Sequence, residues 1–359
     1  MQDDKTVIFM VTNGAGLGHL TRGLAVARRL KQMDPKLNII FFSTSLATEV
    51  IRETGFMFFY IPTKAIMPSS MTNSTWNEYL GRQLNEILDI YHPVALVYDG
   101  AYPYKGLLSS LGKKKIKSIW IKRECYKEGI RDLGAIESLF NLVIVPKEIS
   151  SMQVIGTPRK KYCEPIMFLD KEEAHEREQI RKQLNITDKH RLYYIQLGAG
   201  VINETDSLLN HIVKIVLKDE NNRIMLGESI IGKKSNIYHP HIFIIRSYPN
   251  AQYFNALDIA ISAAGYNTFH ELLYFGIPTV FIPNMKTSMD DQLARIQQAV
   301  KRNACLCLQE NERCTGYEET INKANVLSES LKVNAQQLIT KNGAIEAAGY
   351  INEFINDTM

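Results

Sequence analysis

A histidine near the N-terminus follows a glycine-rich turn and could take part in proton transfer. The segment NGAGLGH occupies residues 13–19, directly after an apolar run at 6–12 that is typical of a buried parallel strand. Glycines let the backbone turn sharply and approach a ligand, and the following helix points free N–H groups at the same spot. Imidazole titrates near neutral pH, so His19 could take a proton from an attacking hydroxyl. A structural role, in which His19 only caps the turn, stays open.

The same glycines fit part of a dinucleotide-binding fingerprint, which needs the pattern G-x-G-x-x-G and a carboxylate at the end of the second strand. Gly14 and Gly16 fit the first two positions, but His19 takes the third. The second predicted strand ends in FFST at 41–44, with no carboxylate. Both departures disfavour an oxidoreductase.

Asp99 is a second polar residue at the end of a predicted strand, 94–99. The carboxyl ends of parallel strands form the ligand-binding edge of an α/β sheet, so Asp99 could orient His19 or bind a substrate hydroxyl. An Asp-Gly pair, here Asp99 and Gly100, is also common in turns. Both interpretations stay open.

A second candidate site lies within residues 258–292. A strand at 258–262 leads into a turn of small residues at 263–265, and a helix is predicted to begin near Asn267 or Thr268. The N-terminus of a helix after such a turn can hold a diphosphate through its backbone N–H groups. The sequence therefore indicates an anion-binding turn here.

Three polar residues follow this turn, and each has two interpretations. Glu271 stands three residues after Thr268, so the two fit a capping box, but the Glu271 carboxylate could also bind the two hydroxyls of a ribose. A loop after Pro283 leads to Asp291 and Gln292, where another helix is predicted to begin. Their side chains could bind sugar hydroxyls or cap that helix.

Alternating strands and helices must position these residues. Predicted strands of the first half lie at 6–12, 38–43, 57–62, 94–99, 116–122 and 142–146, with helices such as 19–33 and 74–91 between them. A charged helix at 171–184 opens a second series, with strands at 191–197, 222–227, 241–246, 258–262 and 277–283. This order predicts the α/β class, with two Rossmann-like domains facing each other across a cleft.

The domain boundary is predicted within residues 147–170, which contain two prolines and a basic RKK run typical of a linker. We assign residues 1–158 to an N-terminal domain and residues 159–342 to a C-terminal domain. A last helix, with its apolar residues at 344–356, falls within the remaining segment 343–359.

Composition excludes several classes of protein. The net charge of the 359 residues is only +4, which is too small for the concentrated basic surface of a nucleic-acid-binding protein. The five cysteines include no C-x-x-C pair, which disfavours a zinc site. No apolar stretch approaches the roughly 18 residues that span a membrane, and no signal sequence precedes the first strand. We therefore expect a cytoplasmic protein.

Two motif regions resemble those of the GT-B glycosyltransferases. They are GAGLGHLTR at 14–22 and AAGYNTFHELLYFGIPTVFIPN with a later DDQ at 263–292. The second region, with its pattern G-x-x-T-x-x-E, is similar to the branch that contains the peptidoglycan N-acetylglucosaminyltransferase and, more distantly, to the UDP-glycosyltransferase superfamily. This resemblance implies that the N-terminal domain binds the acceptor, that the C-terminal domain binds a nucleotide sugar, and that the last helix crosses back to the first domain.

The resemblance also implies roles for single residues. His19 would be the catalytic base, with Asp99 beside it, and Glu271 would bind the ribose of the donor. The other donor-binding residues that we assign are Gly16, Gly18, Gly198, Ala199, Gly200, Arg246, Ser247, Gly265, Tyr266, Asn267, Thr268, Asp291 and Gln292.

The activity that the resemblance implies is the inverting transfer of a sugar from a nucleoside diphosphate sugar, with UDP as the default, to an acceptor hydroxyl. No metal and no other cofactor is expected. The acceptor would be a carbohydrate or a lipid-linked molecule of cell-surface polysaccharide or glycolipid synthesis, reached by peripheral contact with the inner face of the membrane. Hydrolysis or 2-epimerisation of a nucleotide sugar, and non-catalytic binding of one, stay open as alternatives.

Overall fold

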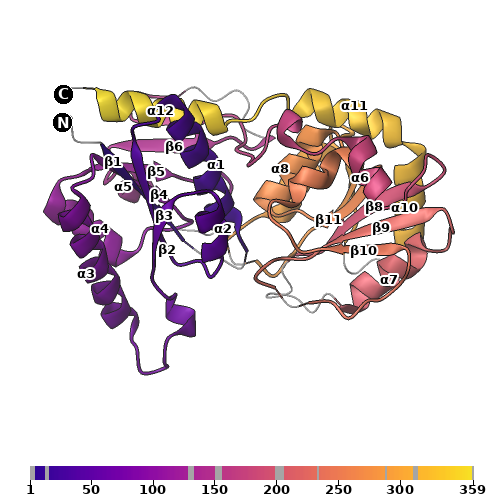
Figure 1. Cartoon of the computed structure of the whole chain (residues 1–359), viewed down its shortest axis with the longest axis horizontal. Helices are drawn as coiled ribbons and strands as arrows, with labels where there is room; N and C mark the ends of the chain where they lie inside the picture. The colour runs from indigo at the N-terminus through magenta and orange to yellow at the C-terminus, as the bar shows by residue number, and fades with distance from the viewer. Residues whose placement is uncertain are drawn as a thin grey trace. The chain divides into compact units, whose positions relative to one another are not determined.

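The computed structural model describes residues 5–12, 16–127, 133–149, 156–198, 206–232, 234–287, 289–309 and 314–357. The chain forms two compact units. Unit 1 comprises Met1–Lys147, Ser151–Phe168 and Gly343–Met359, and unit 2 comprises Glu148–Ser150 and Leu169–Asn342. Each unit is built on one parallel sheet covered by helices (Figure 1), so the predicted α/β class is confirmed.

The sheet of unit 1 runs in the order β3-β2-β1-β4-β5-β6-β7, with all strands parallel. These strands are β1 (Thr6–Val11), β2 (Asn38–Ser43), β3 (Met57–Tyr60), β4 (Ala95–Asp99), β5 (Lys117–Ile121), β6 (Leu142–Pro146) and β7 (Lys160–Cys163). The strand order reverses between β1 and β4. In sheets of this kind, ligands bind beyond the carboxyl ends of the strands at such a reversal.

Helices cover both faces of this sheet (Figure 1). They are α1 (Gly18–Met33), α2 (Thr48–Glu53), α3 (Asn73–Tyr91), α4 (Lys105–Lys114), α5 (Gly134–Glu137) and α12 (Ala344–Asn356), with a 3-10 turn η1 (Lys64–Ile66) before α3. Apolar residues of α3 and α4, such as Leu84 and Leu107, share one buried cluster with alternate residues of the strands, such as Ile8 and Tyr98. Period-two strands and period-3.6 helices therefore meet in a single core.

Helix α12 returns the C-terminal segment to unit 1, where it lies beside α1 (Figure 1). Its buried residues, including Ala347, Ala348 and Ile351, recur at the spacing of one helix face. Gly343 starts this segment and lies against the backbone of Glu164, which is far away in the sequence. A Cβ at Gly343 would lie 1.8 Å from the Glu164 carbonyl oxygen. Only glycine fits at this position.

The sheet of unit 2 runs in the order β10-β9-β8-β11-β12-β13 and is also parallel. Its strands are β8 (Arg191–Gln196), β9 (Asn222–Gly227), β10 (Ile242–Ile245), β11 (Ile259–Ala263), β12 (Thr279–Ile282) and β13 (Leu306–Cys307). Its helices are α6 (Arg177–Gln183), α7 (Asp206–Val216), α8 (Tyr266–Phe275), α9 (Gln292–Val300), α10 (Cys314–Val326) and α11 (Ser328–Leu338), with 3-10 turns η3 (Lys171–Glu173) and η4 (Asn250–Ala256). Across the described parts of both units, no helix has the length and apolar character needed to cross a bilayer.

The structure corrects the domain boundary. β7 pairs with β6 in the register Val143↔Lys160, so the chain from 159 to 168 belongs to unit 1. The assignment of this segment to the C-terminal domain is therefore wrong. Conversely, Glu148–Ser150 belongs to unit 2. The predicted helix at 171–184 is divided into η3 and α6. Asp170 and Glu173 form a capping box at the start of η3, and the extended backbone of Ala174 ends it after one turn.

Candidate active site

His19 and Asp99 meet at the carboxyl edge of the unit 1 sheet. β1 and β4 pair in the register Val11↔Asp99, and the N–H of Thr12 donates to the Asp99 carbonyl oxygen at 3.1 Å. The next helix, α1, packs so closely on β1 that a Cβ at Gly23 would lie 2.6 Å from Val11 Cγ1. His19 is the second residue of α1, and its Nδ1 lies 2.7 Å from Asp99 Oδ1.

The protonation states of this pair follow from their surroundings. Burial alone would raise the pKa of Asp99, but Arg22 and His19 together hold that pKa below its ordinary value, so Asp99 is ionised at neutral pH. Burial lowers the pKa of His19, and the hydrogen bond to Asp99 opposes this only in part, so the imidazole is neutral. A neutral imidazole has one N–H, and Nδ1 carries it because a carboxylate oxygen lies 2.7 Å away. Nε2 therefore holds the lone pair that can accept a proton.

Arg22 completes this group of three, which we call the unit 1 cluster, and the sequence analysis did not assign it. Its Nε donates to Asp99 Oδ2 at 2.8 Å and its Nη2 donates to Asp99 Oδ1 at 2.5 Å. Arg22 is 2% exposed and Asp99 is 0% exposed. The available signal was spacing, since residues three apart share a face of a helix and Arg22 follows His19 by three.

Four of the predicted glycines have backbones that border open space. A Cβ at Gly16, Gly18, Gly198 or Gly265 would meet no heavy atom of the described chain within 4 Å. All four follow strand ends, and Gly198 has a φ of 102°, which favours glycine. A ligand could approach these backbones closely. The neighbouring predicted residues Ala199 and Gly200 lie outside the described residues.

The turn before α8 has the geometry of an anion-binding helix start. Gly265 is the N-cap, and α8 begins at Tyr266, one residue before the predicted start. A glycine N-cap has no side chain to accept hydrogen bonds from the first N–H groups of the helix. The predicted residues Asn267 and Thr268 therefore lie in the first turn, where backbone N–H groups and the helix dipole favour negative charge.

Thr268 and Glu271 do not form the capping box that the sequence left open, because Gly265 is the N-cap of α8. The Thr268 hydroxyl donates to Gln196 Oε1 at 3.4 Å and so connects α8 to the end of β8. Glu271 lies in the second turn and is 8% exposed. Its carboxylate is thus not used as a helix cap.

Arg246 and Ser247 follow the edge strand β10. The Arg246 guanidinium forms an ion pair with Glu228 at 3.2 Å and donates to the carbonyl oxygens of Ile230 and Gly232. Ser247 Oγ accepts a hydrogen bond from Gln252. The Arg246 side chain thus holds the segment that follows β9, and binding of the donor by Arg246 or Ser247 stays a prediction.

Asp291 and Gln292 both have local roles at the start of α9. Asp291 is the N-cap, and its Oδ1 accepts from the N–H of Ala294 at 2.9 Å. Gln292 Oε1 accepts from the N–H of Asn284 at 2.9 Å and so closes the loop between β12 and α9. The capping interpretation is therefore correct for Asp291, and contact of the pair with a sugar stays a prediction.

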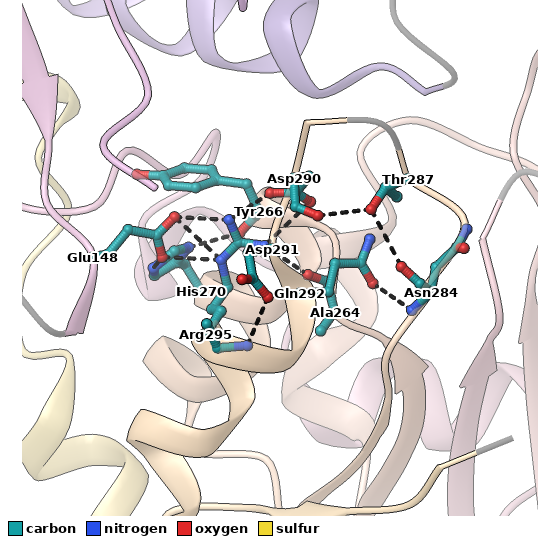
Figure 2. A network of polar contacts seen from close by, with 11 residues as sticks. Glu148, Ala264, Tyr266, His270, Asn284, Thr287, Asp290, Asp291, Gln292 and Arg295 are labelled. Atoms are coloured by element: carbon teal, nitrogen blue, oxygen red, sulfur yellow. Dashed lines mark hydrogen bonds and ion pairs between the residues drawn. The ribbon is translucent and has the colours of Figure 1, made fainter. Parts of the chain in front are cut away.

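A buried network connects this loop to the α8 turn (Figure 2). Arg295 of α9 donates to both carboxylate oxygens of Glu148, through Nε at 2.9 Å and Nη2 at 2.7 Å. The same guanidinium pairs with Asp290 at 2.8 Å and donates to the Ala264 carbonyl oxygen at 2.9 Å. Arg295 therefore ties the residue before Asp291 to the residue before the N-cap of α8.

His270 completes what we call the unit 2 cluster, which consists of Glu148, His270, Asp290 and Arg295. Its Nδ1 donates to the Tyr266 carbonyl oxygen at 2.7 Å, and its Nε2 lies 3.5 Å from Glu148 Oε2. Burial lowers the pKa of His270 to about 4, so the ring is neutral at neutral pH. Elsewhere in the described chain, as here, no group of three or more His, Cys, Asp or Glu side chains could hold a metal ion.

The sequence has relatives of known name. Residues 232–348 match the profile of the glycosyltransferase family 28 C-terminal domain. The protein named UDP-N-acetylglucosamine--N-acetylmuramyl-(pentapeptide) pyrophosphoryl-undecaprenol N-acetylglucosamine transferase from Listeria monocytogenes is 23% identical, over 97% of this chain and 99% of its own length. A protein of the same name from Acetivibrio thermocellus is 22% identical, over 98% of both chains.

Solved structures share the fold over the whole chain. MurG of Acinetobacter baumannii matches with a TM-score of 0.68 and 15% identity, over 97% of this chain and 99% of its own. CalG4, described as the calicheamicin glycosyltransferase, matches with a TM-score of 0.72 and 11% identity, over 99% and 100%.

Proposed function

Because this chain is a glycosyltransferase with the GT-B fold and resembles the peptidoglycan N-acetylglucosaminyltransferases, we propose that it transfers a sugar from a UDP-sugar to a hydroxyl of a lipid-linked acceptor in the synthesis of a cell-surface polymer. The observation that carries the proposal is the buried His19–Asp99 pair, which leaves Nε2 of a neutral imidazole as proton acceptor. A lipid-linked acceptor also requires peripheral contact with the inner face of the membrane.

In the proposed reaction, His19 Nε2 takes the proton of the acceptor hydroxyl while the oxygen attacks the anomeric carbon of the donor. The new C–O bond forms as the bond between that carbon and the phosphate oxygen breaks, and the nucleoside diphosphate leaves with the electron pair. Attack opposite the leaving group inverts the anomeric centre. Asp99 orients the ring and stabilises the imidazolium that forms.

We propose that unit 2 binds the donor. The glycine backbones that border open space at Gly198 and Gly265, and the α8 N-terminus that follows Gly265, support a diphosphate site. Their N–H groups would stabilise the charge of the leaving diphosphate, so the proposed reaction needs no metal ion. Glu271 is proposed to bind the ribose hydroxyls, and Asp291 with Gln292 to contact the sugar.

The first experiment is a thermal-shift screen of the purified chain against nucleotide sugars, because a preferred donor stabilises the native state by mass action. The selected donor is then incubated with and without a lipid-linked acceptor, in the presence of EDTA, and UDP and sugar products are identified by mass spectrometry and NMR. We expect UDP release that depends on the acceptor, and a glycosylated acceptor with inverted configuration.

Three outcomes of this experiment would overturn transfer. Free sugar formed without acceptor indicates a hydrolase. A changed sugar still attached to UDP indicates an epimerase. Donor binding without turnover with every acceptor tried indicates a binding protein.

A further inference from the structure

The arginine of the unit 1 cluster contacts both members of the proposed catalytic pair. Arg22 binds the Asp99 carboxylate with two hydrogen bonds, at 2.8 Å to Oδ2 and 2.5 Å to Oδ1. The same Nη2 lies 3.2 Å from His19 Nδ1. A bidentate arginine fixes a carboxylate in one plane, so Arg22 determines which oxygen faces His19.

The contact with His19 has a different electrostatic character from the contact with Asp99. Nδ1 carries the imidazole proton and donates it to Asp99 Oδ1, so the nearby Nη2 is a second donor and not a hydrogen-bonding partner of the ring. When Nε2 takes a proton, the ring becomes positive beside a guanidinium that is always charged. A pair of histidine and carboxylate alone would only favour that positive charge.

The other charged groups around His19 act in both directions. Asp99 at the end of β4 favours the protonated ring, whereas Arg22 on α1 and Arg123 after β5 disfavour it. Arg22 is the cation in direct contact with the pair, since its Nη2 lies within hydrogen-bond distance of Asp99 Oδ1 and 3.2 Å from Nδ1. Its charge is therefore the one that a substitution can remove with the largest effect on the ring.

We propose that Arg22 is a positioning residue that holds Asp99 in the plane His19 requires and opposes the positive charge that His19 gains when it takes the acceptor proton. This inference rests on the proposed role of His19 as the base. Its consequence is that His19 stays neutral, and so able to accept a proton, at lower pH than a histidine and carboxylate alone would allow. The imidazolium also returns its proton to water more readily after each turnover.

The test compares Arg22→Gln, which keeps a hydrogen-bond donor for Asp99 but removes the charge, with Arg22→Lys, which keeps the charge. The pH dependence of kcat/KM is measured for the full chain with UDP-N-acetylglucosamine and a lipid-linked acceptor, and the His19 ring is titrated by NMR without substrates. In Arg22→Gln, the acid limb and the His19 titration should both move to higher pH by about one unit. Arg22→Lys should keep both near the wild-type position.

Arg29→Gln is the matched control, because it removes another buried arginine of the same helix, about 10 Å further along the helix than Arg22 and about 15 Å from His19. It should leave the His19 titration unchanged. The inference is overturned if Arg22→Gln leaves both curves in place or moves them to lower pH. If Arg22→Gln does not fold, an Arg22→Lys variant whose His19 titrates away from the wild-type position overturns it as well.

Failure of the proposed function gives a different result. If His19→Ala keeps its transfer rate while Arg22→Gln still shifts the NMR titration, then Arg22 controls the ring but the ring is not the base. If His19→Ala loses transfer activity and the His19 titration does not change in Arg22→Gln, then the proposed role of Arg22 is wrong, and the proposal that His19 is the base still stands.

Discussion

Each unit buries a histidine with a carboxylate and an arginine, but the two histidines are held in opposite ways. In unit 1, Nδ1 of His19 faces Asp99 at 2.7 Å, and Nε2 is left as the proton acceptor. In unit 2, Nδ1 of His270 is bound to the Tyr266 backbone, and Nε2 faces Glu148 at 3.5 Å. His19 stands at the start of its helix beside a glycine loop, whereas His270 is 0% exposed within α8.

This difference shows that the same residue types can be arranged either for the proton transfer that we propose or for a structural role. In the unit 1 cluster, the Asp99 carboxylate orients the His19 ring, and Arg22 holds the Asp99 carboxylate. In the unit 2 cluster Arg295 is the centre, because it binds Glu148, Asp290 and the Ala264 backbone together (Figure 2). We therefore expect changes in the unit 2 cluster to affect stability and changes in the unit 1 cluster to affect the reaction.

The largest expected effect on stability is that of Arg295→Met. This substitution leaves Glu148, 2% exposed, without its guanidinium partner, and breaking a buried ion pair on one side costs about 3–5 kcal/mol of unfolding free energy. Urea unfolding measures the loss. The matched control is Lys218→Met, which removes an exposed pair with Glu318 and should cost less than about 1 kcal/mol. Equal effects of the two variants would refute the stabilising role that we assign to Arg295 in the unit 2 cluster.

A second effect concerns the pH dependence of stability. The pKa of His270 is about 4 in the folded chain against an ordinary value of 6.5, so between these values only the unfolded chain binds the proton. Stability should therefore fall as pH falls from about 6.5 to about 4, by up to about 3 kcal/mol from this residue. His270→Asn should reduce that loss, as measured by urea unfolding at pH 7 and pH 5. An unchanged difference between the two pH values would contradict a buried neutral His270.

The smallest expected effect distinguishes the roles of two carboxylates of unit 2, Glu271 in donor binding and Glu148 in stability. Glu271→Gln should weaken binding of UDP by about tenfold, since a hydrogen bond to a charged group contributes about 1.5–3 kcal/mol. Isothermal titration calorimetry measures the affinity. Glu148→Gln, in contrast, should lower stability and leave the affinity of the folded protein near the wild-type value. If Glu148→Gln weakens UDP binding as much as Glu271→Gln does, the unit 2 cluster and the donor site are not separate.

Local patterns were sufficient for every strand of the two sheets except β7 and β13, and for part of one of the two clusters. The runs at 6–12 and 94–99 are apolar except at their ends, as neighbouring central strands of a parallel sheet require, and their pairing brings Asp99 to the loop before His19. One of the two interpretations of Asp99 therefore agrees with the geometry. Arg22 shares a helix face with His19, but an arginine on a helix faces solvent in most proteins, so this spacing alone did not assign it.

The unit 2 cluster left no signal in the sequence. Glu148 and Arg295 are 147 residues apart, and a contact at that separation produces no periodicity in one chain. The boundary at 158 was misplaced for a related reason. The β7 segment KKYC is short and basic, so it reads as a linker, and only its pairing with β6 makes it a strand.

The transfer rate of His19→Ala at saturating UDP-sugar and acceptor, measured beside that of His270→Asn, tests the central claim most directly. We predict that His19→Ala loses about 10²–10⁴-fold of the wild-type rate, the usual contribution of a general base, while it stays folded. His270→Asn should keep a rate near that of the wild type at pH 7. Near-normal transfer by folded His19→Ala would contradict the assignment of the unit 1 cluster as the catalytic centre.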